Sequence, residues 1–125
     1  MAIKKKIKTT KIDTLVGRHA KIIGDIRYSG GLHIEGFVEG NIIPEENDKC
    51  IVIVSELGVV EGELHGPSII INGTVNGNVY ATGTLELAAG AKINGNVYYN
   101  LLEMTVGAEV NGNLVHQEVP KKSEA

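Results

Sequence analysis

Val75-Asn76-Gly77-Asn78-Val79 recurs as Ile93-Asn94-Gly95-Asn96-Val97 and again as Val110-Asn111-Gly112-Asn113-Leu114, and this repetition decides the fold. Weaker copies are centred on Gly24, Gly40 and Gly62, so that successive central glycines lie 16, 22, 15, 18 and 17 residues apart. A period of this size is typical of a solenoid, in which one repeat cannot bury its apolar face without its neighbours.

The six copies share aliphatic residues two positions before and two positions after the glycine. The preceding column is Ile22, Val38, Val60, Val75, Ile93 and Val110. The following column is Ile26, Ile42, Leu64, Val79, Val97 and Leu114. Four positions before the glycine stand the small residues Ala20, Gly36, Gly58, Gly73, Ala91 and Ala108. Positions two apart share one face of an extended chain. We therefore expect the aliphatic side chains to point inward, and the small residues to lie where there is no room for more.

A second apolar pair lies upstream of the glycine. Its members are Leu32 and Ile34, Ile51 and Ile53, Ile69 and Ile71, Leu85 and Leu87, and Leu102 and Met104. Each repeat thus holds two short strands and room for a third, which makes one coil of a three-sided parallel β-helix at ~3.3 Å per residue. Coils stacked ~4.8 Å apart place like residues above like, so the asparagine columns should form ladders on the outside. We predict an all-β, single-domain β-helix of about six coils.

An antiparallel meander is the main alternative, because Asn-Gly between apolar runs is also the strongest short signal for a β-hairpin. However, Asn72-Gly73 and Asn76-Gly77 begin only four residues apart, which is too close for two hairpins. The aliphatic residues also keep one parity through the glycine, as a continuing strand would. Both observations favour the β-helix.

The chain divides into a basic leader at residues 1–11, a β-helix domain at residues 12–116 and a tail at residues 117–125, and both end segments are expected to be disordered. Within the domain, the polar run Pro44–Lys49 explains the step of 22 residues as an insertion that loops out at a corner. Cys50 is the one cysteine of the sequence, which suits a reducing cytoplasm. The sequence has no apolar run long enough to span a bilayer, and the leader lacks the apolar core of a signal peptide.

Charge is distributed unevenly along the chain. Residues 1–27 carry eight Lys/Arg and two Asp/Glu, whereas residues 28–116 carry two Lys/Arg and eleven Asp/Glu. With 4% aromatic residues, the acidic body lacks the phosphate contacts and stacking platforms that nucleic-acid binding needs, so no nucleic-acid partner is expected. The basic leader has two interpretations: a solvated segment, or a weak tether to an anionic membrane surface, each lysine contributing ~1 kcal/mol near such lipid. The tether residues would be Met1, Ile3, Lys4, Lys5, Lys6, Ile7 and Lys8.

The sequence predicts no catalytic, cofactor-binding or metal site. Its histidines, His19, His33, His65 and His116, fall at different positions of the repeat without a second ligand at metal spacing, and are interpreted as surface residues. No nucleophile–base pair or phosphate loop is recognisable, so the protein is not expected to be an enzyme. Phe37 falls in an outward column, where it is a candidate contact residue.

Both ends of the predicted β-helix are candidates for self-assembly. A monomeric solenoid needs polar capping repeats, and an open β edge is otherwise a template for another chain. The sequence predicts no cap at either end. The expected interface residues are Ile22, Ile23 and Ile26 at the N-terminal end and Val110, Leu114 and Val115 at the C-terminal end.

This pattern resembles the bactofilin family. The opening of a bactofilin resembles Thr14-Leu15-Val16-Gly17, Ile23-Gly24-Asp25-Ile26 and the run from Leu32 to Ile42, and its later coils resemble the run from Leu85 to Val97. The resemblance implies a right-handed β-helix that polymerises without nucleotide into non-polar filaments in the bacterial cytoplasm. It also implies a place at the inner face of the cytoplasmic membrane and recruitment of envelope-building or peptidoglycan-remodelling proteins.

Two features depart from the family. Bactofilins often carry a phenylalanine near the C-terminal end of the helix, where this chain has Leu114 and Val115, and the insertion at Glu45–Lys49 is longer than expected. Two other functions stay open. A hexapeptide-repeat acyltransferase needs a strict six-residue period and a catalytic histidine in a cleft between subunits. A non-polymerising β-helical binding module would remain monomeric.

Overall fold

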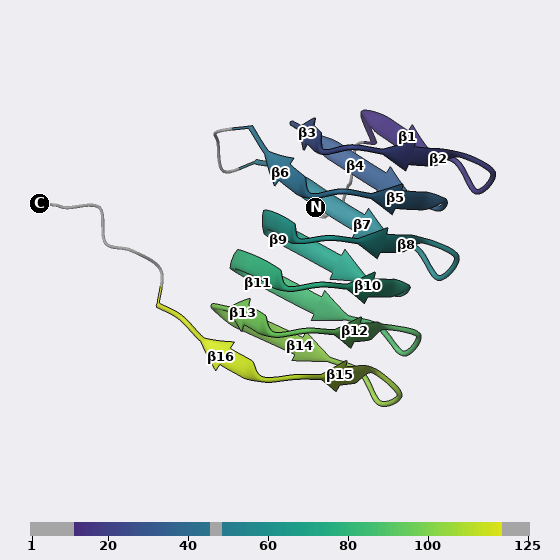
Figure 1. The fold of residues 1–125 in the computed structure, drawn as a ribbon. Coiled ribbons are helices and arrows are strands. Elements are labelled where there is room, and N and C mark those ends of the chain that lie inside the picture. The colour runs from purple at the N-terminus through teal and green to yellow at the C-terminus, as the bar shows by residue number, and fades with distance from the viewer. Residues whose placement is uncertain (1–11, 46–48, 119–125) are drawn as a thin grey trace, which may run out of the picture.

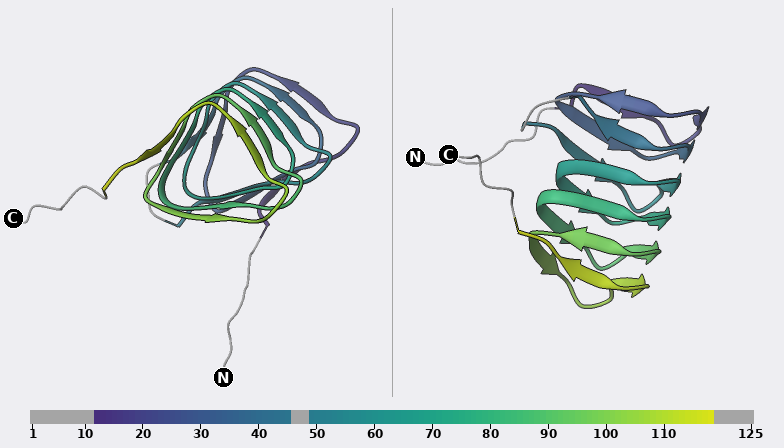
Figure 2. Two further views of the ribbon diagram at one scale, coloured as in Figure 1. Left: turned by 90° about the horizontal axis from the view of Figure 1, so that it is seen from below. Right: turned by 60° about the vertical axis from the view of Figure 1, so that its left-hand side comes forward.

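The computed structural model of the chain describes residues 12–45 and 49–118, and over these residues sixteen short strands wind into a parallel β-helix (Figure 1). Viewed along its axis, the molecule has a triangular cross-section, with the coils lying one above another (Figure 2). The described residues contain no helix, and every strand pairing between coils is parallel. The predicted all-β parallel solenoid is therefore confirmed.

Each of the six coils contributes one strand segment to each of three sides, which we call sides A, B and C. Side A contains β1 (Thr14–Val16), β4 (Gly31–Ile34), β7 (Ile51–Val54), the second halves of β9 (Leu64–Ile71) and β11 (Val79–Leu87), and β14 (Leu101–Met104). Side B contains β2 (Lys21–Ile23), β5 (Phe37–Glu39), β8 (Val59–Glu61), β10 (Thr74–Asn76), β12 (Lys92–Asn94) and β15 (Glu109–Asn111). Side C contains β3 (Ile26–Tyr28), β6 (Ile42–Pro44), the first halves of β9 and β11, β13 (Val97–Tyr99) and β16 (Leu114–His116).

Strand register reproduces the two aliphatic columns beside the glycine. Val38, Val60, Val75 and Ile93 lie above one another on side B, and each is 0% exposed. The column after the glycine likewise stacks in register along side C. Stacked Val, Ile and Leu from all three sides therefore fill most of the interior, and the hydroxyl of Tyr28 is the one side-chain hydroxyl among the buried core residues of the described part of the chain.

The small residues lie at the corner between sides A and B. A Cβ added to Gly58 would be 2.5 Å from the carbonyl oxygen of Ile34, and one added to Gly36 or Gly73 would collide with carbonyl groups of the preceding coil. The backbone of one coil thus passes so close to the next that larger side chains are excluded, as the sequence predicted.

The central glycines lie at the corner between sides B and C, not in the middle of a strand. Gly62 ends one side at φ +150°, and a Cβ added there would collide with the carbonyl oxygen of Gly40 one coil before. The expectation of a continuing strand is therefore wrong. The aliphatic residues before and after the glycine nevertheless both face the axis, because the chain turns around the core at this corner.

One predicted apolar pair was displaced by a single residue. Val52 and Val54, rather than Ile51 and Ile53, pair with Leu32 and Ile34 of the previous coil and are 0% exposed. Ile51 and Ile53 are half-buried on the outside. A slip of one residue exchanges the two faces of a strand, and here it leaves aliphatic side chains on the outer surface of side A.

Corner insertions account for the unequal steps between glycines. The 15-residue step from Gly62 to Gly77 has a minimal corner at Asn72-Gly73. Other coils widen this corner with a turn, such as that closed by the 2.8 Å bond from Gly58 N to Ser55 O. The step of 22 residues has both such a turn and the predicted insertion between β6 and β7.

Candidate self-assembly interfaces

Both ends of the β-helix present open strand edges. In the described residues, β1, β2 and β3 pair only with the second coil, and β14, β15 and β16 pair only with the fifth. Their outer edges therefore carry unpaired backbone N–H and C=O groups, which are a template for another chain. The views in Figure 2 show no described element folded over either end.

At the N-terminal end, the predicted residues divide into two groups. Ile22 and Ile26 are the first members of the two inward columns and are half-buried, because no coil covers them from above. Ile23 faces outward on β2 and is 73% exposed. Val16 begins an inward column of side A at this end, but it is only 6% exposed and so adds little to the terminal surface.

The C-terminal end is built in the same way. Val110 and Leu114 end the inward columns, and Leu114 is 44% exposed. Val115 faces outward in register with Tyr98. Met104, which is 45% exposed, ends an inward column of side A and also belongs to this surface. The apolar pair upstream of the glycine predicted an inward position for Met104, but only the stacked register places it on the terminal surface.

The two terminal coils differ in charge. The first coil carries Arg18, Lys21 and Arg27 alongside two aspartates, whereas residues 101–118 contain three glutamates and no lysine or arginine. Lys21 and Glu109 occupy the same column of side B at opposite ends of the molecule. A junction between unlike ends would therefore bring opposite charges together.

The predicted membrane tether, from Met1 to Lys8, lies outside the described residues, as does most of the predicted tail. Within residues 12–45 and 49–118, no helix is long and apolar enough to cross a membrane.

Asparagine side chains form two kinds of ladder on the outer surface. On side B, Asn94 Nδ2 donates to Asn76 Oδ1 at 2.7 Å, and Asn111 Nδ2 donates to Asn94 Oδ1 at 2.9 Å. This is the predicted amide ladder. In the column that follows the glycine, side-chain oxygens instead accept backbone N–H groups of the next coil, as at Asn96 N and Asn78 Oδ1, 2.9 Å apart. The second ladder thus satisfies backbone donors at the corner.

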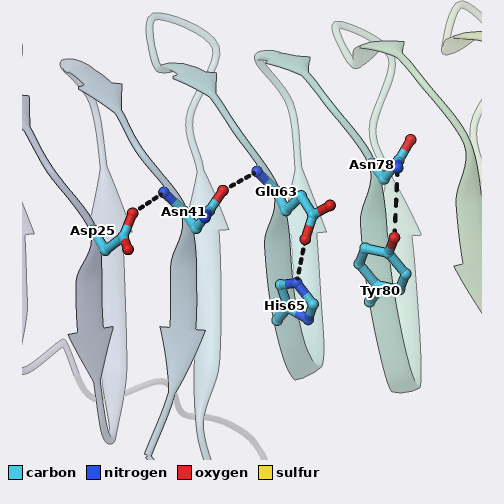
Figure 3. A network of polar contacts seen from close by, with 6 residues as sticks. All are labelled: Asp25, Asn41, Glu63, His65, Asn78 and Tyr80. Atoms are coloured by element: carbon cyan, nitrogen blue, oxygen red, sulfur yellow. Dashed lines mark hydrogen bonds and ion pairs between the residues drawn. The ribbon is translucent and has the colours of Figure 1, made fainter.

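The second ladder begins at the acidic residue Asp25, continues through Asn41 and is interrupted at Glu63 (Figure 3). Asp25 Oδ1 accepts the backbone N–H of Asn41 at 2.9 Å, and Asn41 Oδ1 accepts that of Glu63 at 3.0 Å. The side chain of Glu63 turns away to His65, whose Nε2 lies 3.0 Å from Glu63 Oε1. These carboxylates are therefore engaged in structural contacts.

Aromatic rings stack along the outside of side C. The ring centroids of His65 and Tyr80 are 4.4 Å apart, and those of Tyr80 and Tyr98 are 4.8 Å apart, with the planes nearly parallel. The ring faces of Tyr80 are covered by its neighbours, so a ligand ring cannot stack there. Phe37 faces outward as predicted, with Lys21 Nζ 5.2 Å from its ring centroid; its role as a contact residue stays a prediction.

The described residues bring no chemically reactive constellation together. His33 lies on side A, His65 and His116 lie in different columns of side C, and His19 lies in a turn. Over residues 12–45 and 49–118, no group of three or more His, Cys, Asp or Glu side chains could hold a metal ion. The most distinctive surfaces of this part of the chain are therefore its two ends.

Tyr28 is an exception to the aliphatic interior. It is 4% exposed, and its hydroxyl donates to the carbonyl oxygen of His65 at 3.0 Å, in the space left by Gly66. Burial, followed by the nearby Cys50 thiol, raises the pKa of this hydroxyl well above its ordinary value. The hydroxyl thus stays neutral and ties β3 to β9.

Comparison with known proteins identifies what the chain is similar to. The family model described as "Bactofilin: Polymer-forming cytoskeletal" matches residues 14–115. Bactofilin BacO of Myxococcus xanthus (strain DK1622) is 30% identical to the chain over 89 residues, which are 71% of this chain and 68% of that protein. No solved structure matches the chain.

Proposed function

The chain belongs to the bactofilin family of polymer-forming cytoskeletal proteins, and we propose that it assembles end to end, without nucleotide, into filaments that serve as a scaffold. The observation that carries this proposal is the pair of open ends, each with unpaired strand edges and half-buried aliphatic residues. Stacking two ends would pair the free backbone groups and continue the aliphatic columns from one subunit into the next.

No further component is needed for this assembly step. Edge pairing supplies the directional contacts, and burial of Ile22, Ile26, Val110 and Leu114 supplies the apolar contacts. The reaction is association alone, so we assign the protein a structural role and no catalytic one.

Substitution of Leu114 by arginine tests the end contact. Leu114→Arg would place a charge among the apolar residues of the junction without a partner, which is costly. We expect short soluble species in light scattering, with the β-sheet circular dichroism signal retained. Val115→Arg is the matched control on the same strand, because its side chain faces outward, and it should weaken assembly less. Thr82→Arg, at an exposed position of the corner between the fourth and fifth coils, should leave filaments unchanged.

The size of the Leu114→Arg species also reports how the ends pair. Dimers joined through intact N-terminal ends would indicate like-to-like junctions, as in the non-polar filaments that the resemblance implies. Monomers would indicate junctions between unlike ends, which the opposite charges of the terminal coils favour. Filaments as long as those of the unaltered protein would contradict the end contact itself.

We further propose that the filament lies at the inner face of the bacterial cytoplasmic membrane and organises cell-shape or envelope- and peptidoglycan-remodelling proteins. Support comes from family membership and from the leader, in which Lys4, Lys5, Lys6 and Lys8 accompany Ile3 and Ile7. Weak tethers repeated along a polymer gain strongly from avidity.

Removal of residues 1–8 tests the tether separately from assembly. The truncated protein should still form filaments but should no longer co-float with anionic vesicles. Added salt should release the full chain in the same way, because screening shortens the reach of the lysines. Binding to neutral vesicles that salt does not affect would contradict the electrostatic tether.

A further inference from the structure

Side A carries an apolar strip on its outer surface that the self-assembly proposal does not use. Leu15, His33, Ile53 and Ile70 follow one another in register along β1, β4, β7 and the second half of β9. Leu15 is 57% exposed and the two isoleucines are half-buried. Ile51 lies beside Ile53 on the same face of β7. We call these five residues the side-A strip.

His33 continues the strip rather than interrupting it. Neither of its ring nitrogens is exposed to solvent or hydrogen-bonded among the described residues. Glu35 Oε2 is 3.6 Å from His33 Nε2, which is beyond hydrogen-bonding distance. The ring therefore packs as part of the surface between Leu15 and Ile53.

Acidic residues border the strip on one flank and at one end. Glu35 flanks it in the second coil, and Glu86 and Glu103 continue the same outward column in the fifth and sixth coils. The strands of side A contain no lysine or arginine. This combination favours a basic segment with apolar side chains. It disfavours a second copy of side A, which would bring carboxylates against carboxylates, and it disfavours an anionic membrane.

We propose that the chain's own leader, residues 1–11, docks on the side-A strip. Ile3 and Ile7 provide the apolar side chains, and five lysines provide charges opposite to those of the acidic border. The leader joins the domain at Ile12, immediately before β1, whose Leu15 begins the strip.

The leader is long enough to reach the strip. From Leu15 to Ile70 the strip crosses three coil spacings, or ~14 Å, and the five residue steps from Ile7 to Ile12 span up to ~17 Å when extended. A segment tethered this closely has an effective concentration in the millimolar range, so weak contacts suffice.

Docking withdraws the lysines and isoleucines of the leader from the membrane surface. Side A and anionic lipid thus compete for one segment, and only the undocked fraction of leaders is free to bind lipid. The docking is independent of filament formation, whereas this competition rests on the proposed membrane tether.

A single tryptophan in the leader tests the docking, because the chain has none of its own. In the full chain carrying Ile7→Trp, without lipid, we expect indole emission at shorter wavelength than in a peptide of residues 1–11 with the same substitution. The shift should not change on dilution. Adding Ile53→Lys on side A should return the emission to that of the peptide. Val59→Lys is the matched control, an outward half-buried residue of the same coil on side B, and it should retain the shift.

Three results would overturn the docking: emission equal to that of the free peptide, equal effects of Ile53→Lys and Val59→Lys, or a shift that disappears on dilution. Light scattering of the same samples reports filament formation separately. With phosphatidylglycerol vesicles, Ile53→Lys should bind about tenfold more tightly than Val59→Lys if nine-tenths of the leaders are docked. If Ile53→Lys abolishes the emission shift but binds the vesicles no more tightly than Val59→Lys does, the competition with lipid and the membrane tether are contradicted. The docking itself is not.

Discussion

At the scale of single residues, the direction of each side chain decides its contribution to stability. Ile93 is 0% exposed in the middle of an inward column, whereas its neighbour Asn94 bonds Asn76 and Asn111 on the surface. Ile93→Ala should lower the free energy of unfolding by about 2–5 kcal/mol through lost burial and a residual cavity. Asn94→Ala should cost about 1 kcal/mol, since exposed hydrogen bonds exchange with water. Denaturant unfolding followed by circular dichroism measures both free-energy changes. Equal losses would contradict the assignment of Ile93 to the interior and Asn94 to the surface.

Residue direction was predictable from the sequence wherever apolar and polar residues alternate. The columns two residues from the glycine alternate with asparagine or acidic residues, and their inward direction is confirmed. Ile51-Val52-Ile53-Val54 has no polar member, so its inward pair could not be chosen from sequence alone. Stacking on Leu32 and Ile34 makes that choice, and it also creates the side-A strip.

At the scale of elements, Tyr28 links two strands that are far apart in sequence. Its raised pKa means that the folded protein keeps the hydroxyl neutral where the unfolded chain already loses the proton. This contribution to stability is fully present below the unfolded pKa of about 10 and is lost as pH rises above it. The free energy of unfolding should therefore fall more steeply above pH ~10 in the unaltered protein than in Tyr28→Phe. Parallel pH curves for the two proteins would contradict the buried, hydrogen-bonded hydroxyl.

Corners were harder to predict than strands. The sequence correctly distinguishes the pairs Asn76-Gly77 and Asn94-Gly95 from hairpins, but it predicts them within continuing strands, which is wrong. The repeat fixes which residues share a column but not where the chain bends. The bend is fixed by the approach of two backbones, where a Cβ on Gly77 or Gly95 would collide with the glycine carbonyl of the neighbouring coil. Contacts between coils of this kind are not visible in one repeat.

At the scale of the whole molecule, the number of coils and the two open ends follow from the repeat, and the family follows from its motifs. Of the six interface residues predicted from the sequence, four do end inward columns: Ile22, Ile26, Val110 and Leu114. Ile23 and Val115 face outward instead, and side A adds the exposed residue Met104. The terminal surfaces combine all three sides, so their full composition requires the register of every strand.

End-to-end stacking is tested most directly by diffraction from oriented filaments of the purified protein, prepared without nucleotide or added metal. If β-helices stack along the filament, the ~4.8 Å spacing between coils must appear on the meridian. Six coils then give an axial rise of ~29 Å per subunit. A ~4.8 Å reflection on the equator would mean that the β-helices lie across the filament and associate through their sides. That result, or a protein that remains monomeric under these conditions, would contradict assembly through the open ends.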